Sequence, residues 1–180
     1  MTISPGTYEL GPDSGTLTVR TGRVGAAARA GHDLLLRVGR WSATLELADD
    51  PAQSRVSLSA DSRSLSVVEG TGGLKALDDD DRRSIAKTID DEVLKGTTIA
   101  FHSTSVRHDG DGRYRVTGDL ELAGATNLIA FEVTIDPDGR LTGSATVRQS
   151  DWGMKPYSAL FGTLKVADEV VVEIDARLGG

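Results

Sequence analysis

The chain has 180 residues, a formal net charge of −7 and a pI near 4.9. This length fits one domain over residues 1–180, and the negative charge argues against a nucleic-acid partner, which needs clustered Lys and Arg. The chain has no cysteine, which excludes disulfides and thiolate zinc sites and suits a reducing compartment.

The start of the chain lacks a basic region followed by an apolar run. No apolar stretch approaches the roughly 18 residues that a membrane span needs. We therefore expect a soluble, cytoplasmic protein without a membrane span.

The first third of the chain contains short alternating segments. A first strand is predicted over residues 8–20, with a Gly-Pro-Asp-Ser-Gly interruption, and the alanine-rich residues 24–30 could form a short helix. Residues 34–47 have the pattern of one long strand whose apolar positions change parity across Gly39, which predicts a β-bulge there. Residues 56–60 alternate as the next strand.

One substantial helix is predicted over residues 79–95. Gly96 follows it, and apolar residues recur at spacings of three and four at Ile85, Ala86, Ile89 and Val93. The acidic run at residues 78–81 lies at the helix N-terminus, where negative charge complements the exposed amides and the macrodipole. This run lacks the ligand spacing of a calcium loop. We expect the helix to cover one mouth of a barrel.

The second half of the chain contains strands separated by turn residues. Apolar and polar residues alternate in its last four segments, and a further strand precedes them. The five predicted strands cover residues 99–106, 114–122, 129–135, 141–147 and 170–178. The whole pattern predicts an all-β fold: an antiparallel, up-and-down, lipocalin-like barrel of about eight strands.

The interior of such a barrel is either packed or hollow. A barrel of roughly eight strands fills with side chains or holds one small ligand. Glycine and alanine interrupt the inward-facing apolar rows, and such small residues can leave an elongated hole but serve sheet curvature and close packing equally well. The alternation alone does not decide between a packed and a hollow interior.

Five motifs in order resemble the YceI-like family. They are residues 6–10 (GTYEL), 99–106 (IAFHSTSV), 116–124 (VTGDLELAG), 131–133 (FEV) and 149–153 (QSDWG). The resemblance implies an extended lipocalin-like barrel that binds a polyisoprenoid or similar lipid tail in an apolar tunnel, without catalysis. The segment before Phe101 departs from the family pattern, since it has Asp80-Asp81-Arg82-Arg83 and an aliphatic helix.

The expected tunnel lining follows from the inward faces of the strands together with this resemblance. The predicted ligand-binding residues are Leu17, Val19, Leu45, Phe101, Tyr114, Val116, Leu120, Phe131, Val133, Ala145, Val147, Trp152, Val172 and Ile174. The expected partner is a hydrophobic small molecule, with no cofactor and no metal. A homodimer is possible.

Two other classes of function remain open in the sequence. A barrel with a solid core would be an interaction module, and Trp41, Trp152 and Tyr157 are candidates for its exposed patch. A hydrolytic enzyme would use His32 as a base beside Asp33. However, neighbouring strand residues point to opposite faces, so a turn role with backbone hydrogen bonds is favoured for His32.

One segment, residues 154–161, has no predicted element. It could form an interface loop or a lid at the barrel mouth. The basic residues Arg148, Lys155 and Lys165 near it could pair with an anionic lipid head, or could be solvated surface charges.

Overall fold

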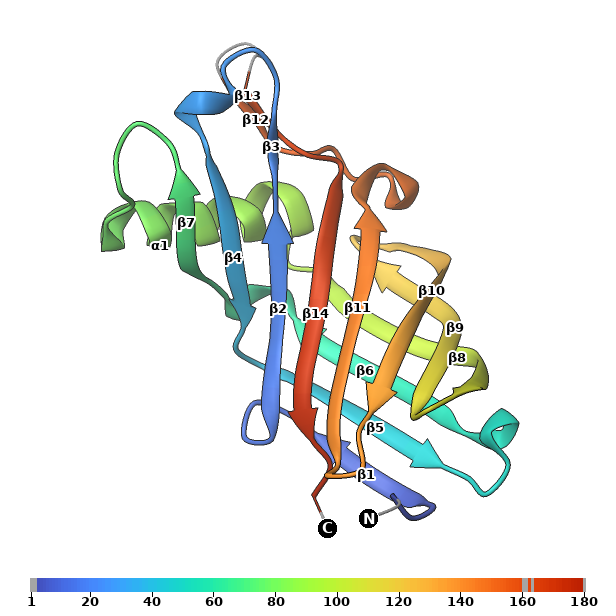
Figure 1. The fold of residues 1–180 in the computed structure, drawn as a ribbon. Helices are drawn as coiled ribbons and strands as arrows, with labels where there is room; N and C mark the ends of the chain where they lie inside the picture. The colour runs from blue at the N-terminus through green and yellow to red at the C-terminus, as the bar shows by residue number, and fades with distance from the viewer. Residues whose placement is uncertain (1–2, 160–161, 163, 180) are drawn as a thin grey trace.

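The protein is described by a computed structural model that covers residues 3–159, 162 and 164–179. Within these residues, eleven antiparallel strands form one strongly curled sheet, and a helix lies across its open side (Figure 1). In spatial order the strands are β1 (Gly6–Leu10), β5 (Trp41–Leu47), β6 (Arg55–Asp61), β8 (Thr98–Gly110), β9 (Arg113–Leu122), β10 (Ala125–Ile135), β11 (Arg140–Arg148), β14 (Glu169–Arg177), β2 (Gly15–Thr21), β4 (His32–Val38) and β7 (Leu65–Gly72).

A small second sheet lies at one end of the large one, at the top of Figure 1. It consists of β12 (Ser158–Ala159), β13 (Leu164–Val166) and β3 (Arg23–Val24). It joins two segments that are far apart in the sequence, because Lys165 pairs with Val24 and Val166 with Arg23.

The strands of the second half agree with their alternation. β8 to β11 are neighbours in chain order, and β11 continues to β14 with Ala145 opposite Val172. Each segment buries or half-buries its apolar parity, as the pattern predicts for a sheet with one dry face.

The prediction of a single strand over residues 34–47 is wrong. β4 pairs with β2 and β7, whereas β5 pairs with β1 and β6, so the chain turns from one part of the sheet to another at Gly39. The parity changes because a new strand begins, and the register shift in this region lies between Leu35 and Leu36. Gly39 lies close to another backbone, donating its N–H to the Ser64 carbonyl at 2.9 Å.

The first predicted strand also divides in two. β1 pairs with β5 at one edge of the sheet, whereas β2 pairs with β14 and β4 near the other edge. These two divisions add two strands to the predicted eight, and β7, a segment for which no strand was predicted, is the eleventh strand of the sheet in the described residues. The resulting order replaces the simple up-and-down order. The predicted short helix at residues 24–30 is reduced to a 3₁₀ turn, η1 (Ala28–Ala30).

The main helix begins where the sequence predicts. α1 (Asp79–Thr88) has a capping box, in which the Asp78 carboxylate accepts from the Asp81 N–H at 2.8 Å and Asp81 accepts from the Asp78 N–H at 3.2 Å. It continues as a π-helix, η4 (Ile89–Leu94), and ends in two left-handed residues, Lys95 and Gly96. The remaining short helices are η2 (Pro51–Gln53), η3 (Ser62–Ser64) and η5 (Gln149–Trp152).

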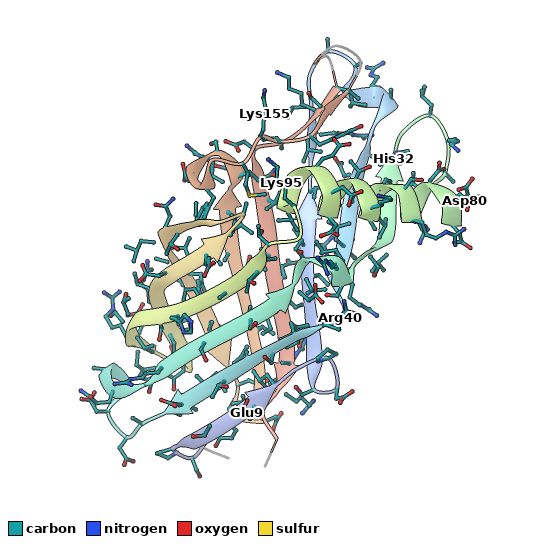
Figure 2. All side chains as sticks on the ribbon, turned by 180° about the vertical axis from the view of Figure 1, so that it is seen from behind. Glu9, His32, Arg40, Asp80, Lys95 and Lys155 are labelled. Carbon is teal, nitrogen blue, oxygen red and sulfur yellow. The ribbon has the colours of Figure 1, made fainter. Side chains whose placement is uncertain are left out.

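Side-chain contacts hold α1 and η4 against the curled sheet. Arg82 donates to the Val68 carbonyl on the edge strand β7 at 2.8 Å, and the buried Ser62 donates to Asp90 at 3.2 Å. Seen from behind, the helix lies above strands β5, β6 and β8 (Figure 2). The helix therefore completes the upper part of the wall next to β7.

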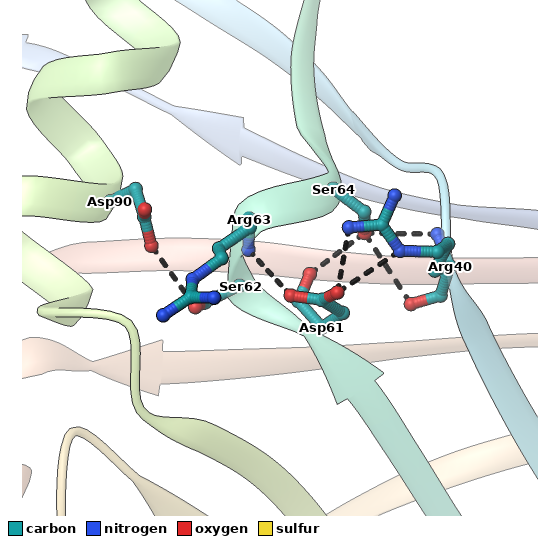
Figure 3. A network of polar contacts seen from close by, with 6 residues as sticks. All are labelled: Arg40, Asp61, Ser62, Arg63, Ser64 and Asp90. Carbon is teal, nitrogen blue, oxygen red and sulfur yellow. Dashed lines mark hydrogen bonds and ion pairs between the residues drawn. The ribbon is translucent and has the colours of Figure 1, made fainter.

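A polar network joins the two corners where the chain changes from β4 to β5 and from β6 to β7 (Figure 3). The Arg40 guanidinium donates to the Asp61 carboxylate at 2.7 and 3.0 Å, and the Arg63 N–H donates to the same carboxylate at 2.9 Å. The Ser64 hydroxyl donates to the Asp61 carbonyl at 2.7 Å. Since η3 carries both this network and Ser62, the corners and the helix are attached at one place.

Asp61 makes the stability of this corner depend on pH. Hydrogen bonds from Arg40 and from the Arg63 backbone lower the pKa of the Asp61 carboxyl from its ordinary value of 3.8. The contribution of the carboxylate to stability is therefore complete above the unfolded-state pKa and is lost as pH falls through the folded-state pKa. We expect Asp61→Asn to lower the urea midpoint near neutral pH, with a difference that shrinks as pH falls below the ordinary carboxyl pKa of 3.8. An equal difference at neutral and at strongly acidic pH would contradict this origin.

Candidate ligand-binding cavity

A cavity of about 610 Å³ occupies the interior of the curled sheet. All eleven strands of the large sheet contribute to its wall, and α1 and η4 complete it. The wall is almost entirely aliphatic and aromatic in the middle of the barrel.

The lower end of the cavity is closed by packed side chains. This floor contains Leu10, Leu17, Trp41, Ile135, Leu141, Ala176 and Leu178, all buried in one core cluster. β14 shows the change from floor to cavity, since Ala176 is 2% exposed whereas the inward-facing Val172 and Ile174 are only half-buried and line the cavity. The interior is therefore packed near the chain termini and hollow above them.

The structure brings thirteen of the fourteen predicted tunnel residues to the wall of one cavity. They are Leu17, Val19, Leu45, Phe101, Tyr114, Val116, Leu120, Phe131, Val133, Ala145, Val147, Val172 and Ile174. The alternation of the strands places them, because residues two apart on a strand share a face.

Trp152 has a different position from the other predicted residues. It follows β11 in the 3₁₀ turn η5, is 4% exposed and packs in a core cluster with Phe101 and Val116. Its indole Nε1 donates to the Leu120 carbonyl at 2.8 Å. Trp152 is absent from the cavity wall formed by the described residues, and its contacts anchor η5 to β9. Strand parity gives no information about a residue in a turn.

An aromatic pair stands on one wall of the cavity. The rings of Phe101 and Phe131 are 5.2 Å apart between centroids and inclined by 59°, a tilted arrangement that aromatic pairs prefer. Gly118 leaves room for this pair, because a Cβ there would lie 2.6 Å from the Phe101 ring. The Phe101 ring therefore fills the space next to Gly118, and this glycine does not itself create part of the hollow.

The helix contributes lining residues that the predicted set omitted. Ile85, Ile89 and Val93 line the cavity together with Ser84 and Thr88. Their spacing of four residues was visible in the sequence as the apolar face of a helix, but it did not indicate whether that face meets a packed core or a hollow.

The upper end of the cavity is more polar than its middle. Arg23, His32, Tyr157 and Lys165 all line it there. The Arg23 guanidinium donates to the Gly31 carbonyl and lies 3.6 Å from the Asp33 carboxylate.

His32 and Asp33 do not form a catalytic pair in this arrangement. The His32 Nε2 is 2.7 Å from the Lys75 carbonyl, in the loop between β7 and α1, whereas Asp33 is engaged by Arg23. His32 thus makes the backbone hydrogen bond that the sequence favoured, but from the first residue of β4 instead of from a turn.

The exposed aromatic patch of a solid-core module does not form from the expected residues. Trp41 and Trp152 are both buried, and only Tyr157 is exposed. Of the unplaced segment, Met154 is buried and Ser158–Ala159 form β12 of the small sheet, while residues 160 and 161 lie outside the described residues. Arg148 pairs with Glu169 at 3.0 Å, whereas Lys155 and Lys165 are exposed.

None of the helices in the described residues combines the length and the apolar character required to cross a membrane.

Comparisons with solved structures agree with this fold. BcnA of Burkholderia cenocepacia superposes with a TM-score of 0.63 at 15% identity, covering 89% of this chain and 94% of that one. The YceI protein of Campylobacter jejuni gives 0.57 at 13% identity, covering 81% and 85%. A polyisoprenoid-binding domain of Saccharophagus degradans gives 0.52 at 12% identity, covering 96% and 99%. At these identities the likeness concerns the fold.

Sequence comparison identifies the family. UPF0312 proteins from two strains of Pseudomonas putida are 32% identical over 82 residues, which is 41% of this chain and 43% of the length of each relative. The match therefore spans less than half of these relatives. The model of the YceI-like domain matches residues 8–178. The chain belongs to the YceI-like family.

Proposed function

We propose that this protein binds one hydrophobic small molecule, a polyisoprenoid or a related lipid, inside its barrel and does so without catalysis. The observation that carries the proposal is the apolar cavity of about 610 Å³, closed by a packed floor and bordered by polar residues at its upper end. A tail would lie against the aliphatic wall, with its polar head towards Arg23 and Lys165. The polyisoprenoid-binding domain of similar fold supports this class of ligand.

The apolar wall supplies enough free energy for useful affinity. Each buried methylene contributes about 0.8 kcal/mol, so about ten methylene-sized groups give about 8 kcal/mol before the costs of association. A tail with more buried groups than this reaches micromolar affinity, which corresponds to about 8 kcal/mol net. Binding of this kind needs no catalytic group.

The two alternative classes receive less support from the geometry. A solid-core interaction module is disfavoured by the cavity, and a hydrolase using His32 is disfavoured by the separate partners of His32 and Asp33. We place the binder in the cytoplasm, a reducing compartment that suits a chain without cysteine.

Phe131→Ala tests the binding role against a packing role. If Phe131 borders a ligand space, the variant should lose about tenfold in lipid affinity, equivalent to about 1.4 kcal/mol. Its loss of unfolding free energy should stay below the about 3–5 kcal/mol of a Phe→Ala change in a packed core. Solvent extraction of bound lipid and urea unfolding measure the two effects.

Leu128→Ala is the matched control for that variant. Leu128 lies on the same strand but is 63% exposed, so its removal should leave lipid retention unchanged. A full core-sized loss of stability in Phe131→Ala, with unchanged lipid retention, would contradict the proposed function.

A further inference from the structure

Two segments that meet at the upper end of the barrel are basic and contain no acidic residue. Residues 22–31 contain Arg23 and Arg29, and residues 153–167 contain Lys155 and Lys165, without an Asp or Glu in either segment. Pairing of β3 with β13 brings the segments together. We call the described residues of these two segments the apex. The four basic residues give the apex a formal charge of +4. Because the whole chain carries −7, the remainder carries −11.

The apex differs from the walls of the barrel because its cations have no acidic residue in their own segments. On the walls, several arginines are matched by carboxylates, as in Arg20 with Glu173 at 2.8 Å and Arg140 with Asp175 at 2.6 Å, although not all of them are. At the apex, Arg29, Lys155 and Lys165 are exposed, and the described residues form no ion pair with them. Carboxylates of the described residues therefore do not neutralise these three positive charges, which are accessible to a binding partner.

Exposed apolar side chains accompany this charge. Val24 is 45% exposed and Tyr157 43% exposed, and both belong to the apex. Leu74, at 83%, lies in the β7–α1 loop, which the His32 contact to Lys75 holds beside the start of β4. Cations mixed with a tyrosine and aliphatic side chains are typical of surfaces that contact the lipid headgroup region.

The cavity reaches this same surface. Arg23, Tyr157, Lys165 and Val166 belong to the apex and also line the cavity, whereas the opposite end is the packed floor. A partner that covers the apex would therefore face the upper end of the cavity directly.

We propose that the apex docks the barrel on the surface of an anionic lipid bilayer. Basic side chains near such a surface are attracted by its negative potential, and Val24, Tyr157 and Leu74 would enter the headgroup region. Docking in this orientation places the upper end of the cavity against the membrane, so that a lipid passes between them with little exposure to water. That last consequence rests on the proposed function, whereas docking itself does not.

Vesicle co-sedimentation of the full chain tests this proposal. We expect binding to vesicles of equal parts phosphatidylcholine and phosphatidylglycerol, weak binding to phosphatidylcholine alone, and release by salt. Arg29→Gln/Lys155→Gln should weaken binding by roughly fivefold for each cation removed, or about 25-fold in total. Thermal unfolding checks that the variant is folded.

The matched control removes two cations from the other end of the barrel. Arg55 begins β6 and Arg177 ends β14, and both are exposed. Arg55→Gln/Arg177→Gln has the same net charge as the apex variant and should bind the anionic vesicles as the unmodified protein does. Failure of the unmodified protein to bind them at low salt, or equal losses in both variants, would overturn the proposal.

A separate readout distinguishes this failure from a failure of the proposed function. Lipid retained by the purified protein is measured by solvent extraction in the absence of vesicles. Retained lipid without vesicle binding overturns docking alone, whereas vesicle binding through the apex without any bound lipid overturns the proposed function alone.

Discussion

Replacing Ala145 by phenylalanine is expected to abolish retention of a long-chain lipid while the protein stays folded. Ala145 lies in the middle of β11, opposite Val172, and its side chain faces the cavity. A phenyl group there would occupy space that the tail needs. Because the new ring enters a hollow apolar space, it should also stabilise the protein, by up to about 1.5–3 kcal/mol for full burial.

The sign of the stability change separates a hollow barrel from a packed one. In a packed core the same substitution would cost about 1–3 kcal/mol by overpacking. Thr146→Phe is the matched control, because Thr146 is the neighbouring residue and faces solvent, so its lipid retention should be unchanged. Chemical unfolding together with extraction of bound lipid gives both readouts, and a destabilised Ala145→Phe that keeps its lipid would refute the hollow interior.

The largest loss of stability is expected for Trp152→Ala. Trp152 is buried beside Val116 and Leu120, and its indole donates to the Leu120 carbonyl. Removal of a buried Trp side chain costs about 3–5 kcal/mol, and the variant also leaves a buried carbonyl without this donor. Urea unfolding should therefore show a strongly reduced midpoint.

Trp152→Phe divides this effect into packing and hydrogen bonding. The phenyl ring keeps much of the buried area but has no donor, so we expect a smaller loss of about 1–3 kcal/mol. If Trp152→Ala cost no more than Trp152→Phe, the ring would not be packed as the structure shows.

The sequence was most informative where one strand faces one environment throughout. The strands from β9 to β11 and β14 alternate cleanly, so their inward residues could be assigned by parity. The prediction of a bulge at Gly39 was wrong, because a bulge and the start of a new strand with different partners produce the same shift of parity. Only the pairing between distant segments distinguishes the two, and local periodicity does not report that pairing.

The residues of the candidate site were likewise predictable on the strands but not in the turns or on the helix. Ala145 and Val172 were assignable as inward residues, whereas Trp152 stands in a turn and the face of α1 could have met either a core or a cavity. The absence of acids from residues 153–167 is visible in the sequence, but the meeting of this segment with residues 22–31 depends on the β3–β13 pairing.

The central claim is that the barrel is hollow and holds a lipid, and native mass spectrometry of the purified protein tests it most directly. We expect a discrete adduct above the mass of the chain, which solvent extraction releases as a prenyl or acyl lipid. A mass equal to that of the chain alone, unchanged after incubation with isoprenoid lipids and quinones, would contradict the claim.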